Sequence, residues 1–111
     1  MKKPVRIQRQ RTKGWRMPPN TVSVCRPGKW GNPFMVGPDR TQRQAVECFR
    51  HWLTTPGITA GIAEKKQAIL DGLESLRGKN LACFCKLGTP CHADVLLELA
   101  NVTTMIDQDH E

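Results

Sequence analysis

The sequence predicts a small single-domain α/β fold, in which a sheet of mostly parallel strands is combined with about three helices. Two long segments, from 39 to 53 and from 59 to 76, place apolar residues at helical spacing. Short apolar or alternating segments precede and follow them, as expected of strands. A length of 111 residues is typical of one domain, and strands alternating with helices favour a parallel sheet.

The first two predicted strands lie in the N-terminal quarter. Val5 and Ile7 alternate with basic residues, which permits a short strand. Two prolines at 18 and 19 mark a turn, and residues 21–26 alternate as a half-buried strand does. Residues 27–39 hold three glycines and three prolines, which predicts a long loop. Long ordered loops in small domains are often functional.

The remaining elements follow in a clear order. Asp39 is predicted to cap the first helix, with Gln42 at the capping-box position, and "TTPG" ends that helix. The second helix runs from about 59 to 76 and stops at Gly78. "NLACFC" (80–85) predicts a buried strand, and Thr89 followed by Pro90 predicts the start of the last helix. We therefore expect a basic arm (1–19), a compact domain (20–101) and a flexible acidic tail (102–111).

The positive charge is concentrated at the N-terminus. Residues 1–38 hold nine Lys/Arg and no Asp or Glu, whereas the rest of the chain holds eight Lys/Arg and ten Asp/Glu. A basic surface attracts phosphate, so a nucleotide or a nucleic acid is the expected partner. In "RTKGWRMP" the basic residues interleave with Trp15, and the predicted nucleic-acid contacts are Arg9, Arg11, Lys13 and Arg16. The alternative is a solvated basic tail.

The compartment can be predicted from what the chain lacks. No run of about 18 apolar residues is present, so no membrane contact is expected. The basic N-terminus has no apolar stretch after it, so no signal peptide is predicted. Five cysteines, an odd number, argue against a complete set of disulfides and favour a reducing, cytoplasmic location.

Three cysteines and a histidine cluster in "LACFCKLGTPCHAD" (81–94). The predicted strand end, loop and helix start place their side chains close together. A thiol near a helix N-terminus has a lowered pKa, so Cys85 or Cys91, with His92 as base, are candidate catalytic residues. No cofactor is predicted on this reading. Two alternatives stay open, namely a zinc site and small core residues, and the zinc ligands would be Cys83, Cys85, Cys91 and His92.

A second candidate site is "CRPGKWGNPF" (25–34). Arg26 and Lys29 can hold phosphate, Trp30 can stack on a ring, and Asn32 stands among glycines that let the backbone approach a ligand. The alternative is a tight turn over the core with Trp30 as its plug. If both flanking strands are parallel neighbours, this loop and the cysteine cluster meet at the carboxyl edge of the sheet.

Four segments together, "RTKGWRMP", "RPGKWGNPF", "LRGKNLACFC" and "CHADVLLELAN", resemble an uncharacterised family catalogued as a domain of unknown function. The resemblance covers about residues 6–101, and its members are typical of tailed phages and prophages. It implies a phage or bacterial protein in the host cytosol. The family pattern carries over onto Cys83, Cys85, Cys91, His92 and Asp94, and onto residues 30–34. It also implies a variable position at Cys25, which makes that cysteine a poor candidate for chemistry.

We therefore expect a domain that binds a phosphate-bearing ligand, such as a nucleotide or a nucleic-acid end, with Asp94 added to the ligand-binding residues. One alternative is a zinc-stabilised nucleic-acid-binding module. Another is an interaction protein, such as a phage inhibitor of a host enzyme. The sequence leaves open whether the chain is an enzyme.

Overall fold

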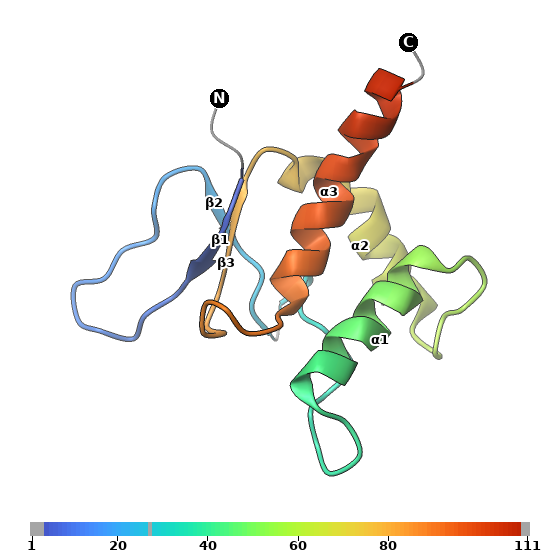
Figure 1. The fold of residues 1–111 in the computed structure, drawn as a ribbon, viewed down its shortest axis with the longest axis horizontal. Coiled ribbons are helices and arrows are strands. Elements are labelled where there is room, and N and C mark those ends of the chain that lie inside the picture. The colour runs from blue at the N-terminus through green and yellow to red at the C-terminus, as the bar shows by residue number, and fades with distance from the viewer. Residues whose placement is uncertain (1–3, 27, 110–111) are drawn as a thin grey trace.

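The computed structural model describes residues 4–26 and 28–109, and for residues 102–109 it describes the backbone alone. It confirms the predicted α/β class: a three-stranded sheet lies beside three helices, all on the same side of it (Figure 1). The elements in chain order are β1 (Arg6–Gln8), β2 (Thr21–Ser23), α1 (Gln42–Thr54), α2 (Ala63–Leu76), β3 (Asn80–Cys83) and α3 (His92–Asp109).

The sheet is parallel throughout, in the order β1-β3-β2. Leu81 of β3 pairs with Arg6 on one side and with Val22 on the other. The central strand is the apolar one, since Leu81 and Ala82 have no exposed surface, and both of its edges are covered by short strands. Because all three strands run the same way, their carboxyl ends share one edge of the sheet.

The core lies between the sheet and the helices. The predicted apolar face of α1 is confirmed, and its buried residues are Ala45, Val46, Phe49, Trp52 and Leu53. Of these, Val46, Phe49, Trp52 and Leu53 pack in one cluster with Ile69 of α2, Leu81 of β3 and Leu96 of α3. Trp52 also donates its indole N–H to the carbonyl of Thr59, 2.9 Å away, which satisfies the one polar atom of this side chain.

The start of α1 differs from the prediction. Thr41, not Asp39, caps the helix, and a complete capping box joins Thr41 to Gln44. The reason is local: Gly37 and Arg40 pair with each other, which holds Asp39 in the turn between them. Similarly, α2 begins at Ala63 because residues 59–62 form a turn in which Ala60 and Gly61 have positive φ.

The start of α3 also differs. Thr89 does not cap the helix, because its amide and its hydroxyl both donate to the carbonyl of Lys86 and so close the preceding loop. Cys91 takes the capping position, and its sulfur accepts the amide of Ala93 at 3.5 Å. The strand β3 ends at Cys83, so Cys85 lies in the loop beyond it.

Regular structure extends into both terminal segments of the described part of the chain. Residues 6–8 of the basic N-terminal segment form β1 and are therefore part of the sheet. In the acidic segment expected to be a tail, α3 continues to Asp109, and residues 110 and 111 lie outside the described part of the chain. Among the helices described, none combines the length and the hydropathy needed to cross a membrane.

Candidate functional site

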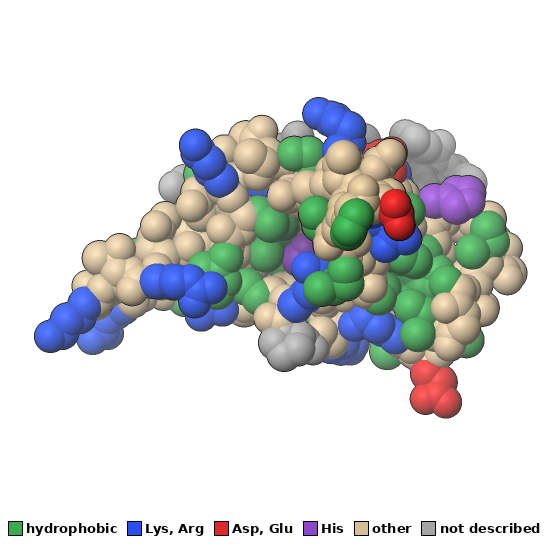
Figure 2. Space-filling view, turned by 90° about the horizontal axis from the view of Figure 1, so that it is seen from below, with side chains coloured by type: hydrophobic (Ala, Val, Ile, Leu, Met, Phe, Trp, Pro, Cys, Tyr) green, Lys and Arg blue, Asp and Glu red, His purple; other side chains and the backbone are tan. Residues whose placement is uncertain are grey.

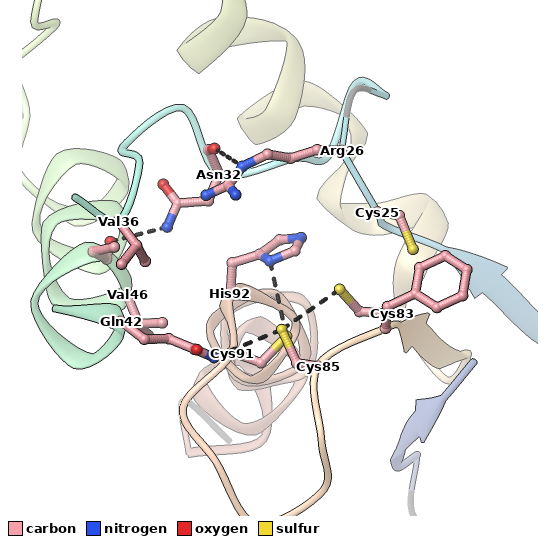
Figure 3. Close-up of a pocket in the computed structure, with 12 residues that line it drawn as sticks. Cys25, Arg26, Asn32, Val36, Gln42, Val46, Cys83, Cys85, Cys91 and His92 are labelled. Atoms are coloured by element: carbon pink, nitrogen blue, oxygen red, sulfur yellow. Dashed lines mark hydrogen bonds between the residues drawn. The ribbon is translucent and has the colours of Figure 1, made fainter. Parts of the chain in front are cut away.

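A pocket of about 280 Å³ opens at the carboxyl edge of the sheet, between the loop after β2 and the start of α3 (Figure 3). As predicted, it brings the two candidate segments together: Arg26 comes from the first, and Cys85 and His92 come from the second. Its walls are formed by Cys25, Arg26, Asn32, Val36, Gln42, Ala45, Val46, Cys83, Phe84, Cys85, Cys91 and His92.

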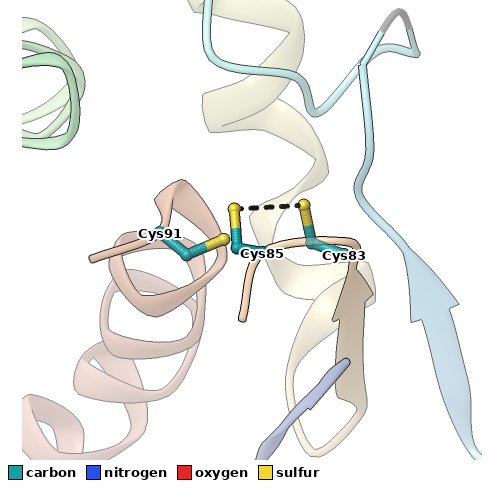
Figure 4. Close-up of side chains that lie close together, drawn as sticks. All are labelled: Cys83, Cys85 and Cys91. Atoms are coloured by element: carbon teal, nitrogen blue, oxygen red, sulfur yellow. Dashed lines mark hydrogen bonds between the residues drawn. The ribbon is translucent and has the colours of Figure 1, made fainter. Parts of the chain in front are cut away.

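Three thiols of this pocket form a compact group that could hold a metal ion. The sulfurs of Cys83, Cys85 and Cys91 all lie within 4.8 Å of one another, and those of Cys83 and Cys85 are 3.8 Å apart. Figure 4 shows the side chains of Cys83 and Cys85 side by side, with the Cys91 side chain turned toward that of Cys85. They come from the end of β3, the following loop and the start of α3. We refer to them below as the thiol group. The sequence predicts that these side chains lie close together, because a strand end, a short loop and a helix start are adjacent in space.

The thiols influence one another strongly. A hydrogen bond with Cys91 lowers the pKa of Cys83 to about 4. The same bond, together with burial, raises the pKa of Cys91, and burial raises the pKa of Cys85. One thiolate is therefore favoured in the group, at the expense of its neighbours. Cys91 is 1% exposed, which makes it a poor nucleophile for any outside reactant.

His92 lies beside the thiol group and is 6% exposed. Its Nε2 donates to the carbonyl of Val24 at 2.6 Å, and its Nδ1 lies 3.8 Å from the sulfur of Cys91. The ring also contacts Phe49 edge-on, with 5.8 Å between the ring centres. Burial lowers the pKa of His92. The imidazole is therefore neutral at pH 7, with its proton on Nε2 and a free lone pair on Nδ1.

Arg26 and Asn32 hold the 26–34 loop in place. Arg26 donates to the carbonyls of Asn32 and Phe34, at 2.6 and 3.2 Å. Asn32 is 3% exposed, donates to the carbonyl of Ala45 and accepts the amide of Phe34. These bonds fasten the loop to α1, so both residues already have structural partners on the wall of the pocket.

Three predicted ligand-binding residues do not line this pocket. Trp30 packs against the core, as in the alternative in which it plugs a turn. A Cβ atom added at Gly72 would lie only 2.8 Å from the Trp30 ring, so this helical glycine makes room for it. Lys29 lies over the Trp30 ring, 4.8 Å from its centre, and Asp94 pairs with Arg6 at 3.0 Å.

The predicted nucleic-acid contacts lie on the loop between β1 and β2, residues 9–20, which we call the basic loop. It projects from the sheet, and Figure 2 shows Lys and Arg side chains along this projecting part of the molecule. The guanidinium groups of Arg9 and Arg11 lie 4.7 and 4.1 Å from the centre of the Phe84 ring. Lys13 and Arg16 are exposed further along the loop.

Sequence reasoning missed two residues of this region. The sequence pattern predicts only that Phe84 belongs to a strand, although its place between Cys83 and Cys85 puts it next to the thiol group. Gln42 comes from α1, and its side-chain amide donates to the sulfur of Cys85 at 3.7 Å and also to the carbonyl of Pro90. A glutamine in the first turn of a helix carries no sequence signal for such a long-range contact.

The fold and the site together define a small α/β domain with a cysteine-lined pocket at the carboxyl edge of its sheet. The family model "Domain of unknown function (DUF4326)" matches residues 7–102, so the chain belongs to this family. The resemblance to an uncharacterised family is thereby confirmed. Neither a curated protein nor a solved structure matches the chain.

Proposed function

We propose that this chain is a nucleic-acid-binding domain whose sheet edge is stabilised by a zinc ion on Cys83, Cys85 and Cys91. The observation that carries the binding proposal is the pair of arginines, Arg9 and Arg11, that share the Phe84 ring at the base of the basic loop. Zinc is the metal proposed because thiolates favour it among the common divalent ions.

The charge distribution supports a polyanionic partner. The chain has a net charge of +7, and its first 38 residues contain no acidic side chain to offset their nine Lys/Arg. Exposed Lys13 and Arg16 extend the positive surface away from Phe84 along the projecting loop. A run of cations on a projecting loop can follow a phosphate backbone, and release of counterions then contributes to affinity.

Phe84 contributes by orienting the arginines. A guanidinium held over an aromatic ring keeps the N–H groups along its own edge exposed. These groups can donate hydrogen bonds to a phosphate. Arg9 also donates to the hydroxyl of Ser23 at 3.1 Å, which limits its freedom further. Arg11 is exposed and is the better placed of the two to contact a ligand.

The pocket is less well suited to a small phosphate-bearing ligand. Arg26 is the one Lys or Arg among the residues that line it, and its guanidinium already donates to two carbonyls. Cysteine and histidine chemistry is also less well supported there, because Cys91 and His92 are almost fully buried. Their positions are explained better by a metal than by a substrate.

We also propose a cytosolic protein of phage or bacterial origin. Five free cysteines, an odd number, support a reducing compartment, where thiols are kept reduced. The resemblance to phage and prophage proteins supports the same location.

The test is the salt dependence of binding to duplex DNA. If three to five cations contact phosphate, a plot of log affinity against log salt concentration should have a slope of about −3 to −4.5. A variant with Arg11, Lys13 and Arg16 changed to Gln should bind more weakly and with a flatter slope. Absence of DNA binding by the zinc-loaded wild type at low salt would contradict the proposal.

A further inference from the structure

We infer that His92 completes the zinc site as its fourth ligand, through Nδ1, and that the filled site holds Phe84 in place beneath the arginines of the basic loop. The second part of this inference rests on the proposed function, whereas the coordination does not.

The separation between the sulfurs of Cys83 and Cys85 matches the edge of a zinc tetrahedron. With Zn–S bonds of about 2.3 Å, two sulfurs of a tetrahedral site lie about 3.8 Å apart. The sulfurs of Cys83 and Cys85 are 3.8 Å apart, and that of Cys91 completes a group within 4.8 Å. A disulfide needs about 2.05 Å between sulfurs, so Cys83 and Cys85 are close neighbours that are not joined as a pair.

His92 has the tautomer and the outer partner of a metal ligand. A backbone carbonyl only accepts, so the bond to Val24 places the proton on Nε2 and leaves Nδ1 free. Metal-binding histidines usually donate their second ring N–H to a carbonyl or a carboxylate in this way. Nδ1 lies 3.8 Å from the sulfur of Cys91, close to the roughly 3.6 Å expected of sulfur and nitrogen on one zinc.

The adjacency of Cys91 and His92 does not prevent both from binding one ion. Cys91 stands just before α3, and its sulfur turns back to accept the Ala93 amide at 3.5 Å. This brings the sulfur to the side on which the His92 ring lies (Figure 3). Nδ1 of His92 lies 3.8 Å from the sulfur of Cys91, but it is not among the ligand atoms that all lie within 4.8 Å of one another. Closing the tetrahedron therefore requires the His92 ring to move toward Cys83 and Cys85.

The surroundings offset the negative charge of three thiolates. Gln42 donates to Cys85 at 3.7 Å, and the Ala93 amide donates to Cys91. The backbone amide of Cys85 donates to Cys83, and the positive charge of Arg6 acts on Cys85. Such outer donors orient metal ligands and are part of a metal site.

The filled site would connect the sheet edge to the nucleic-acid surface. Cys83 belongs to β3, Cys91 precedes α3, and His92 reaches the carbonyl of Val24 just after β2. Phe84 stands between two of the ligands, so zinc fixes the backbone on both sides of it. Loss of the metal would free the ring on which Arg9 and Arg11 lie.

Metal analysis of the purified full chain tests the coordination. After dialysis we expect about one zinc per chain, and we expect this content to be lost in Cys91→Ser. Cys48→Ser is the matched control, because Cys48 lies on α1 outside the thiol group. A folded wild type without zinc, or a disulfide among the three thiols of a protein purified under reducing conditions, would overturn the inference.

Cobalt substitution tests the fourth ligand. Co²⁺ in the wild type should give the visible bands of a tetrahedral site, and His92→Ala should change these bands and weaken binding by about tenfold or more. His51→Ala is the control, since His51 is exposed on α1. If His92→Ala does not fold, His92→Cys should restore folding and add thiolate-to-cobalt absorption. Bands unchanged in His92→Ala, or no added absorption in His92→Cys, would exclude His92 as a ligand.

DNA binding with and without zinc tests the connection. Removing zinc should lower the affinity for duplex DNA by about tenfold, and Phe84→Ala should cause a similar loss while retaining zinc. The two losses should not add, because both act through one ring. Affinity that is unchanged by zinc removal would refute the connection. A zinc-loaded protein that binds no DNA would instead refute the proposed function and leave the coordination standing.

Discussion

The Arg6 guanidinium lies 3.0 Å from the Asp94 carboxylate, and this ion pair joins the first strand to the first turn of the last helix. Arg6 also donates to the carbonyl of Lys86, in the loop between Cys85 and Cys91. The Arg6 side chain is 8% exposed, whereas that of Asp94 is 48% exposed. The N-terminal segment is therefore tied to the loop that carries the candidate metal ligands.

We predict that Asp94→Asn lowers the free energy of unfolding by about 1 kcal/mol, since the carboxylate is half exposed and solvent screens the pair. Arg6→Met should lower the free energy of unfolding by at least as much, because it also removes the hydrogen bond to the carbonyl of Lys86. Urea denaturation measures both changes, with the exposed Asp39→Asn as control. Equal stability of Asp94→Asn and the wild type would mean that the pair contributes nothing measurable.

Much of the framework could be predicted because it depends on patterns of burial. The helical period over residues 45–53 is set by the core that α1 covers, and the structure buries those residues. Parallel strands fix which loops share an edge, so the meeting of Arg26 with Cys85 and His92 followed from topology alone.

The remaining features depend on contacts that no local pattern encodes. Asp39 and Thr41 are both good capping residues, and the pairing of Gly37 with Arg40 decides between them. Arg26 can hold either phosphate or a carbonyl, and only the folded loop shows that carbonyls are its partners. Phe84 becomes relevant through arginines more than 70 positions away in the sequence.

We expect Arg26 to stabilise the folded chain, and not only to bind a ligand. Arg26→Ala removes two hydrogen bonds to the loop carbonyls, so we expect a loss of about 1 to 3 kcal/mol in the free energy of unfolding. Arg43→Ala, on the exposed side of α1, is the matched control. Thermal or urea unfolding checks this, and an unchanged midpoint for Arg26→Ala would show that the loop holds without it.

Asn32 offers a sharper test of the same loop. Asn32→Asp keeps the acceptor for the Phe34 amide but loses the donor to Ala45, and it places a charge where the side chain is 3% exposed. We expect Asn32→Asp to lower the free energy of unfolding by about 2 kcal/mol or more, and by at least as much as Asn32→Ala does. Denaturation curves of the two variants measure both losses. A smaller loss in Asn32→Asp than in Asn32→Ala would contradict a buried donor role.

Lys66 should stabilise the connection between α1 and α2. It is 7% exposed, and its ammonium donates to the carbonyls of Thr55 and Ile58 at 2.8 and 2.6 Å. Lys66→Met preserves the apolar stem but leaves two carbonyls without this donor, so we expect a loss of about 1 to 3 kcal/mol. Lys86→Met, at an exposed loop position, should change the stability little in the same urea assay.

The basic loop should show two separable contributions to nucleic-acid binding. Lys13→Gln and Arg16→Gln each remove one exposed cation, so each should reduce the magnitude of the log–log salt slope on duplex DNA by about 0.9. Phe84→Ala removes no charge, so it should weaken binding with a smaller change in slope. Lys79→Gln has the same charge change outside the basic loop and serves as the control. Fluorescence anisotropy across a series of salt concentrations gives both affinity and slope for each variant. If Lys79→Gln flattened the slope as much as Lys13→Gln, the contacts would be spread over the whole surface, and the basic loop would not be the binding element.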